Sequence, residues 1–382
     1  MGRLRRIGPL AFGSILALLF ASISLLAYAS QLVFPRLPGS TMSVDVDQNL
    51  IDVDADVHSM AMGSDGRIYL GTSYQGYFII YDPSNGTFTN KRQVLPGGTI
   101  IYALASSPDG SIYGGTNNAA YLFRYLPASD SFEFPGQVLP GERDLRSLVS
   151  AADGTIYGGT GPNAHLIRYK PGIDATPIDV GVPMLGEESV SALTAGQDGM
   201  IYGGTSPSGV LFSVNPENNA ITVLDTFNVG INALASSQGK VFAGTADDRL
   251  ISFSYTSGRE DLGQIVPGQT GILSLGATSD GKIFGGTAFR GAYVFEYDPL
   301  GRYATSVMKV TKASSSESSI GALVVAGSGS VYVGTGPRGR LLKITSVTPQ
   351  ATPTAPGPTP TVGNLPFRVY FPHVLNGYNG TW

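Results

Sequence analysis

Residues 65–72 of the chain read DGRIYLGT, and close variants of this octapeptide recur six more times. The further copies are DGSIYGGT at 109–116, DGTIYGGT at 153–160, DGMIYGGT at 198–205, QGKVFAGT at 238–245, DGKIFGGT at 280–287 and SGSVYVGT at 328–335. Successive copies are separated by 40 to 48 residues. A period of this length is typical of units of four short strands, and it argues against helical repeats, which need long amphipathic runs.

Each repeat unit contains signals for four strands. A short apolar run such as 101–105 (IYALA) leads into the Asp-Gly pair, where glycine accepts the positive φ of a hairpin turn. The IYGGT segment follows as a second strand, and a run such as 121–125 (YLFRY) follows as a third. Turns such as Asp82-Pro83 end the third strand, because proline fixes φ and lacks an amide donor, and a looser fourth strand follows. Seven such units predict an all-β fold, a seven-bladed β-propeller.

The two ends of the repeat region predict how the ring closes. The seventh unit has segments for three strands, the last at 341–346, and then reaches Pro349 without a fourth. Residues 42–53 precede the first unit, in the place where a fourth strand would belong. We therefore predict that this N-terminal strand completes the last blade, so that residues 42–347 form one propeller domain.

The repeat pattern I-x-A-L-A-x-x-x-D-G-x-I-Y-x-G-T, followed by a hydrophobic strand and Y-D-P, resembles the propeller repeat of extracytoplasmic two-component regulators. It is more loosely similar to the repeats of streptogramin-lyase-like and YVTN propellers. The Trp-Asp and Gly-His signatures of WD40 repeats are missing from the pattern. The resemblance covers about residues 42–347, and it implies the propeller architecture but no signalling role.

Composition excludes several classes of function. The 382 residues are 42% hydrophobic and 14% charged, with 51 glycines, no cysteine and a formal charge of −4. The apolar fraction suffices for a large core, and the many glycines are typical of tight turns. The absence of cysteine excludes disulfides, thiolate-bound metals and a thiol nucleophile. Because no cluster of Lys or Arg follows residue 6, we expect no nucleic-acid partner.

The N-terminal segment has the pattern of an export signal. Arg3, Arg5 and Arg6 precede an apolar stretch at 9–29 that ends in Ala-Tyr-Ala, the small-x-small pattern of a signal-peptidase site. We predict a signal peptide over residues 1–29. An uncleaved signal anchor is the alternative, because about 20 apolar residues can cross a bilayer. Either form places the rest of the chain outside the cytoplasm, as a secreted or cell-surface protein.

Three further segments flank the propeller. Residues 30–41 are expected to form a linker. Residues 348–364 are rich in Pro and Thr and predict an extended stalk. Residues 365–382 begin with LPFRVYFPHVL, which is too short to span a membrane and resembles the C-terminal tags that follow such stalks in secreted bacterial proteins. The alternative for this segment is a strand that docks on the propeller or on a neighbour.

One position near the start of the first strand can be compared across all seven units. It holds, in chain order, His58, Tyr102, Arg146, Ser191, Asn232, Leu273 and Gly321. In a propeller these residues would line the channel mouth, where His58 could take a proton, Tyr102 donate one, and Arg146 hold a carboxylate. That combination suits β-elimination on a uronic-acid polysaccharide. The alternative is that they are channel-lining polar groups bonded to water or backbone, with Ser191 and Asn232 among the ligand contacts.

Four other residues are candidates for ligand contact. They are His165, Tyr74, Tyr77 and Phe289, in or beside the segments that join second and third strands. The three aromatic rings lie outside the repeating core positions and could stack on a ligand. Ordinary solvated loop residues are the alternative interpretation.

Three carboxylates alternate ahead of His58. Asp52, Asp54 and Asp56 would lie on one face of an extended chain. Oxygen ligands of this kind suit Ca²⁺, although Val57 stands where a calcium loop would have its glycine. The alternative is the exposed face of an outer strand. We expect no cofactor, with Ca²⁺ at these carboxylates as the one candidate exception.

These features together predict an exported bacterial β-propeller that binds a glycan or a protein outside the cytoplasm. A polysaccharide lyase acting on uronic-acid glycans at the channel mouth is the first alternative, and a structural surface protein is the second. The geometry of the mouth distinguishes them. Side chains of His58, Tyr102 and Arg146 within about 8 Å of one another around an open funnel would favour the lyase. A channel plugged by apolar side chains would favour interaction through the rim.

Overall fold

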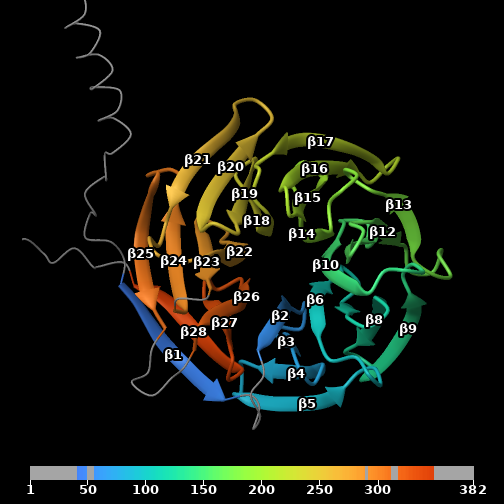
Figure 1. Cartoon of the computed structure of the whole chain (residues 1–382). Coiled ribbons are helices and arrows are strands. Elements are labelled where there is room, and N and C mark those ends of the chain that lie inside the picture. The colour runs from blue at the N-terminus through green and yellow to red at the C-terminus, as the bar shows by residue number, and fades with distance from the viewer. Residues whose placement is uncertain (1–40, 50–55, 289–290, 311–316, 348–382) are drawn as a thin grey trace, which may run out of the picture. The chain divides into compact units, whose positions relative to one another are not determined.

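The computed structural model describes residues 41–49, 56–288, 291–310 and 317–347. These residues form 28 strands in seven four-stranded antiparallel sheets, arranged in a ring around a central channel, and they contain no helix that could span a membrane (Figure 1). The predicted seven-bladed β-propeller is confirmed. It belongs to the first of two compact units of the chain, Met1–Thr348. The predicted signal peptide, linker, stalk and tag all lie outside the described residues, apart from Thr41.

The strands of each blade follow one another outward from the channel. Blade 1 contains β2 (Val57–Met62), β3 (Ile68–Thr72), β4 (Tyr77–Asp82) and β5 (Thr87–Gln93). Blade 2 contains β6 (Ile101–Ser106), β7 (Ile112–Thr116), β8 (Tyr121–Leu126) and β9 (Ser131–Gln137). Blade 3 contains β10 (Asp144–Ser150), β11 (Ile156–Gly161), β12 (Leu166–Tyr169) and β13 (Ile178–Gly181). Blade 4 contains β14 (Ser189–Ala195), β15 (Ile201–Ser206), β16 (Val210–Asn215) and β17 (Ala220–Thr226).

The remaining blades follow the same order, except that the last takes its outer strand from the start of the chain. Blade 5 contains β18 (Ile231–Ser237), β19 (Lys240–Thr245), β20 (Arg249–Ser254) and β21 (Gly258–Gln264). Blade 6 contains β22 (Ile272–Ala277), β23 (Ile283–Thr287), β24 (Tyr293–Asp298) and β25 (Tyr303–Lys309). Blade 7 contains β26 (Ser319–Val325), β27 (Val331–Gly336), β28 (Arg340–Val347) and β1 (Thr41–Asn49).

The recurring octapeptide supplies the first turn and second strand of each blade. In blade 2 the Asp109 carboxylate accepts a hydrogen bond from the Ser111 amide at 3.0 Å, and Gly110 has a φ of 85°. The expected Asp-Gly hairpin turn is therefore present. The terminal threonine holds the loop into the third strand. In blade 1, for example, the Thr72 hydroxyl accepts a hydrogen bond from the Tyr77 amide at 3.0 Å.

Adjacent blades share their cores. Tyr113 of the second octapeptide is fully buried and packs in one cluster with Leu145 and Ile167 of blade 3. At Gly115 a Cβ atom would lie 2.6 Å from the carbonyl oxygen of Leu145, so only glycine lets the inner strand of the next blade approach this closely. The inner-strand hydroxyl of Ser147 also donates a hydrogen bond to the Val190 carbonyl of blade 4 at 2.8 Å.

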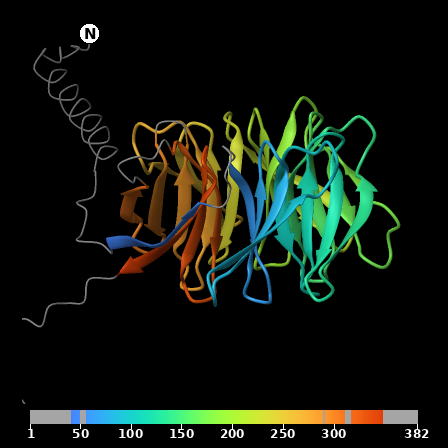
Figure 2. The ribbon, with the colours of Figure 1, turned by 90° about the horizontal axis from the view of Figure 1, so that it is seen from below.

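The ring closes as the ends of the repeat region predict. β1 pairs antiparallel with β28, from Thr41 opposite Val347 to Asn49 opposite Arg340. Figure 1 shows β1 as the outermost strand of the last blade, and Figure 2 shows the same pair from the side. The first described strand of the chain thus completes a sheet whose other three strands are the last ones.

Deletion of residues 1–49 is expected to lower the midpoint of thermal unfolding by about 10 °C or more, because it removes the strand that closes the ring and exposes the edge of β28. Deletion of residues 1–40 is the matched control and should leave the midpoint unchanged. Circular dichroism during heating measures both. Equal midpoints for the two deletions would show that β1 does not stabilise the ring.

Candidate functional site

A β-bulge at the start of every inner strand builds the channel mouth. In all seven blades the pairing of the first two strands skips one residue, for example between Ile101 and Ala103. The skipped residues are His58, Tyr102, Arg146, Ser191, Asn232, Leu273 and Gly321. A bulge redirects the side chain of its extra residue. These seven residues, with Asp56 and Ser319, line a cavity of about 330 Å³.

The three candidate catalytic residues lie in contact along one wall of this cavity. The rings of His58 and Tyr102 meet edge to face, with their centroids 5.0 Å apart. The guanidinium carbon of Arg146 lies 5.3 Å from the centroid of the Tyr102 ring. Arg146 also donates a hydrogen bond to the carboxylate of Asp144 at 2.9 Å. Tyr102 therefore stands between the imidazole and the guanidinium, and the alignment of the repeats correctly places all three at one register.

The electrostatics of this wall fix the protonation states of its members. Burial, and then the charge of Arg146, lower the pKa of His58 to about 4. Burial, and then the charge of Asp144, raise the pKa of Tyr102. At neutral pH the wall consequently presents a neutral imidazole, a neutral phenol and one cationic guanidinium.

The rest of the mouth is uneven. Polar bulge residues continue through blades 4 and 5, where the hydroxyl of Ser191 lies 3.1 Å from that of Ser189 and Asn232 follows. Leu273 and Gly321 leave the side of blades 6 and 7 without a polar bulge side chain. The mouth continues into the channel as a cavity of about 240 Å³, which the seven bulge residues also line. A ring of apolar side chains lines it: Met60, Leu104, Leu148, Leu193, Leu234, Leu275 and Leu323.

The other predicted contact residues do not line the mouth cavity where the structure describes them. His165 directly precedes β12, and its Nδ1 atom lies 3.0 Å from the carboxylate of Asp179 on β13. Tyr77 packs against the core shared by blades 7 and 1. Tyr74 is 64% exposed and has a φ of 64°, which is strained for an aromatic residue. Phe289 lies outside the described residues.

The proposed calcium ligands are only partly described. Asp52 and Asp54 lie outside the described residues. Asp56 lines the mouth, and its backbone amide donates a hydrogen bond to the Ser73 hydroxyl at 2.9 Å. Burial raises the pKa of the Asp56 carboxyl. No group of three or more His, Asp or Glu side chains able to hold a metal occurs within the described ranges. Calcium binding at these three residues stays a prediction.

Buried glutamates form hydrogen bonds with the loops around the mouth. Alignment of the repeats did not identify these glutamates as site residues. The Glu142 carboxylate accepts a hydrogen bond from the Asn163 side-chain amide at 2.7 Å. Glu187 accepts one from the Thr205 hydroxyl at 2.7 Å in the next blade. Each glutamate precedes an inner strand and accepts a hydrogen bond from the loop that follows the octapeptide in its own blade, Glu187 from the Ser208 amide at 3.1 Å. The available signal was the joint occurrence, in one repeat unit, of this glutamate and a proline two residues after the octapeptide threonine.

Asp248 breaks the repeat inside one of these loops. The equivalent position in the other six blades holds Gly76, Ala120, Ala164, Gly209, Ala292 and Gly339. Asp248 is 0% exposed, and neither carboxylate oxygen has a hydrogen-bond partner among the described residues. Burial, and then the charge of Asp247, raise its pKa to about 7. Its ionised form therefore destabilises the folded state.

Asp248→Ala is expected to stabilise the protein by about 2 kcal/mol at about pH 8, and by much less at about pH 4. The carboxyl pKa is about 7 in the folded protein, above its ordinary value of 3.8, so the destabilisation grows as the pH rises between the two. Urea unfolding at both pH values measures the difference. Asp248→Asn is the matched control, which should lose the pH dependence but keep part of the cost of the buried polar group. A gain in stability that is the same at both pH values would contradict this account.

Comparison with known proteins identifies structures that share the fold of this chain, but it identifies no family to which the chain belongs. No protein-family profile and no curated protein sequence matches the chain. Virginiamycin B lyase from Staphylococcus aureus is similar in structure, with a TM-score of 0.68 at 11% identity, over 80% of this chain and 100% of the lyase. A catalytically inactive histidine-to-alanine variant of that lyase with quinupristin gives 0.68 at 12% identity over the same shares.

A WD40 propeller is also similar. The WD40 β-propeller domain of Doa1 matches with a TM-score of 0.61 and 13% identity, over 80% of this chain and 97% of that domain. At these identities the matches establish a shared fold. The likeness to streptogramin-lyase propellers is thereby confirmed at the level of structure, whereas the likeness to two-component regulators stays a prediction. The chain is a seven-bladed β-propeller, and at these identities the matches show its fold alone.

Proposed function

We propose that the protein is an exported binding module whose channel mouth takes a carboxylated glycan. The observation that carries this proposal is the continuous wall of His58, Tyr102 and Arg146 on an open cavity of about 330 Å³. Pockets with a few convergent polar groups beside apolar surface are the usual binding sites of folded domains. Leu273 and Gly321 supply the less polar side here.

Arg146 selects a carboxylate in this proposal. Its side chain is 39% exposed, and Asp144 occupies only one terminal nitrogen of the guanidinium. The Nε atom is buried beside Gly161 and has no hydrogen-bond partner among the described residues, so a ligand would bind the guanidinium through its terminal nitrogens. Arginine has five donors in a planar fork that matches a carboxylate. The neutral imidazole of His58 and the phenol of Tyr102 can exchange hydrogen bonds with sugar hydroxyls without adding charge.

Binding ranks ahead of catalysis because of the basicity of His58. A general base works best with a pKa near the working pH. A pKa of about 4 makes the His58 imidazole a weak base at neutral pH. The same low pKa suits a residue that binds hydroxyl groups while Arg146 provides the only positive charge of the wall.

Export is supported by the N-terminal pattern. Three arginines, an apolar stretch at 9–29 and the Ala-Tyr-Ala ending together match the pattern of a signal sequence. A glycan ligand is consistent with a protein outside the cytoplasm. The absence of cysteine is neutral in this respect.

Arg146→Gln is expected to weaken binding of an oligogalacturonate by about tenfold to a hundredfold, because a hydrogen bond to a charged group is lost from a partly buried site. Isothermal titration calorimetry on the full-length protein measures this. Arg259→Gln, which removes an arginine that packs over Phe227 elsewhere on the ring, is the matched control and should bind as the wild type does. A wild-type protein that binds the carboxyl-reduced oligosaccharide equally well would exclude carboxylate recognition.

A polysaccharide lyase is the second candidate, and the contact of His58, Tyr102 and Arg146 is the specific observation in its favour. In that reaction His58 would remove the proton beside the uronate carboxylate while Arg146 neutralises the developing charge. Tyr102 would donate a proton to the leaving oxygen.

The lyase candidate predicts unsaturated products from uronic-acid polysaccharides, detected by ultraviolet absorbance, and at least a hundredfold slower reaction in His58→Ala. Because protonation of His58 would inactivate the base, the wild-type rate should fall as the pH drops through about 4. Binding of the oligogalacturonate without any unsaturated product would leave the binding module as the function.

A further inference from the structure

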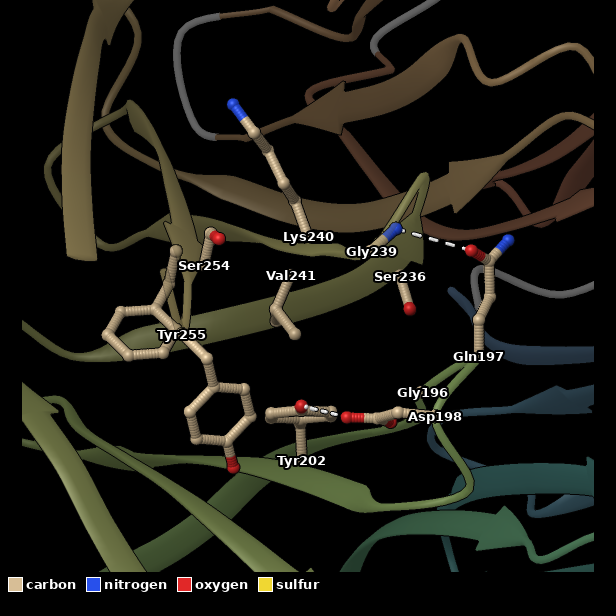
Figure 3. A pocket seen from close by; sticks show the side chains of 11 residues that line it. Gly196, Gln197, Asp198, Tyr202, Ser236, Gly239, Lys240, Val241, Ser254 and Tyr255 are labelled. Carbon is tan, nitrogen blue, oxygen red and sulfur yellow. Dashed lines mark hydrogen bonds between the residues drawn. The ribbon is translucent and has the colours of Figure 1, made fainter. Parts of the chain in front are cut away.

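The face opposite the channel mouth carries a hollow in the seam between blades 4 and 5. The turn after β14 and the end of β20 form its edges, and its volume is about 80 Å³. Tyr202, Phe253 and Tyr255 supply its aromatic walls, and Gln197 and Lys240 supply polar groups. Figure 3 labels all of these except Phe253. The centroids of the Tyr202 and Tyr255 rings are 6.1 Å apart, and those of Phe253 and Tyr255 are 5.9 Å apart.

Tyr255 departs from the repeat at this seam. Phe253 pairs opposite Val241, the fourth residue of the octapeptide in blade 5. Every other blade has a residue that pairs opposite the fourth octapeptide residue, so these residues align the third strands of the seven blades. Tyr255 follows two positions later. Five other blades have proline at that position: Pro83, Pro127, Pro171, Pro216 and Pro299. Blade 5 thus replaces the turn proline with an aromatic side chain.

A short side chain in the neighbouring blade makes room for this ring. Ser213 of blade 4 pairs opposite Tyr202, at a position where blades 2 and 3 have long arginine side chains. In blade 2 this arginine, Arg124, lies over Tyr113 and pairs with Asp109. Ser213 is too short to cover Tyr202 in this way. The Tyr255 hydroxyl lies 3.0 Å from the buried Ser213 hydroxyl and donates a hydrogen bond to it across the seam.

The result is an aromatic ring that is fixed yet open to solvent. The hydrogen bond to Ser213 holds one end of Tyr255, while the residue stays 57% exposed. A tyrosine held in this way offers a flat apolar surface with little side-chain entropy left to lose on binding. A fixed and exposed ring is typical of a binding surface, because a tyrosine that served only the core would be buried.

The polar groups of the hollow indicate the class of ligand. The Gln197 side chain is oriented by a hydrogen bond that its carbonyl accepts from the Gly239 amide at 3.2 Å. The nearest carboxylate to the Lys240 ammonium is Glu260, at 3.9 Å. Figure 3 shows Gln197 across the hollow from Tyr255, and Lys240 at the rim with its side chain extending outward. A pyranose ring has an apolar C–H face and a rim of hydroxyls, which matches a ring surface bordered by an amide and an ammonium. The ammonium disfavours a cationic ligand.

We propose that this seam is a second carbohydrate site, in which a neutral hexopyranose unit stacks on Tyr255 and its hydroxyls bond to Gln197 and Lys240. The proposal rests on the proposed glycan-binding function but uses the opposite face of the ring. The two sites can therefore be tested separately.

Tyr255→Pro restores the residue of the repeat and is expected to reduce binding of a neutral oligosaccharide at least tenfold. Tyr255→Phe keeps the ring and loses only the hydrogen bond to Ser213, so it should reduce binding a few-fold. The probes are cellohexaose, maltohexaose and chitohexaose, with saturation-transfer NMR on the full-length protein as the readout. Phe134→Ala removes another exposed aromatic residue, on β9, and should bind as the wild type does.

Two outcomes would overturn the proposal: none of the three hexasaccharides receives saturation from the wild-type protein, or Tyr255→Pro binds as well as the wild type does. Thermal unfolding of each variant checks that a lost signal is not a lost fold. Arg146→Gln separates the two sites, because it should leave hexasaccharide binding unchanged. If oligogalacturonate fails to bind while the hexasaccharide still requires Tyr255, the function proposed for the mouth falls and this site stands.

Discussion

One close approach, repeated seven times around the ring, underlies the whole structure. In every octapeptide the residue before the threonine is glycine, and the space that its Cβ would need is occupied by the next blade. The residues that fill it are Ile101, Leu145, Val190, Ile231, Ile272, Ile320 and Val57. At Gly71, for example, a Cβ atom would lie 2.6 Å from the Cβ of Ile101. Glycine is therefore required in the second strand so that the β-branched or leucine side chain of the next inner strand can be buried there.

This contact also explains why the residues that line the mouth come from the same position in every repeat. Each residue seated against a glycine is followed at once by the bulge residue, as Ile101 is followed by Tyr102. Because Ile101 is fixed by its neighbour blade and the strand resumes its pairing at Ala103, the extra residue between them must turn away from the sheet. Packing between blades thus aims one side chain per blade at the channel. The side chain at this position varies from histidine to leucine, whereas packing requires Gly321, because a Cβ atom there would lie 2.9 Å from the Val57 carbonyl oxygen.

The sequence predicted the features that depend on periodicity. The octapeptide spacing indicated seven blades, the missing fourth segment after 341–346 indicated the role of β1, and alignment of the repeats brought His58, Tyr102 and Arg146 to one register. It did not predict the bulge, because an extra residue in a strand leaves no mark when every repeat has it. Nor did it single out Asp248 or Tyr255. Asp248 looks like a loop residue until the register shows it in a site that other blades fill with alanine or glycine. Tyr255 becomes informative only beside Ser213, which is in another blade.

Departures from the repeat fall into two groups with different physical costs. Bulge residues and the seam tyrosine replace side chains that face solvent, so the blade contacts do not oppose them. Asp248 replaces a buried small residue, and the fold bears the cost of a carboxyl whose pKa is raised to about 7. Apart from Gly321, where a Cβ atom would meet the Val57 carbonyl oxygen, residues of the first group lie outside the glycine contacts that stabilise the ring. Asp248, in the second group, destabilises the folded state. Because the pKa of its carboxyl is raised, the stability of its loop falls as the pH rises toward neutrality.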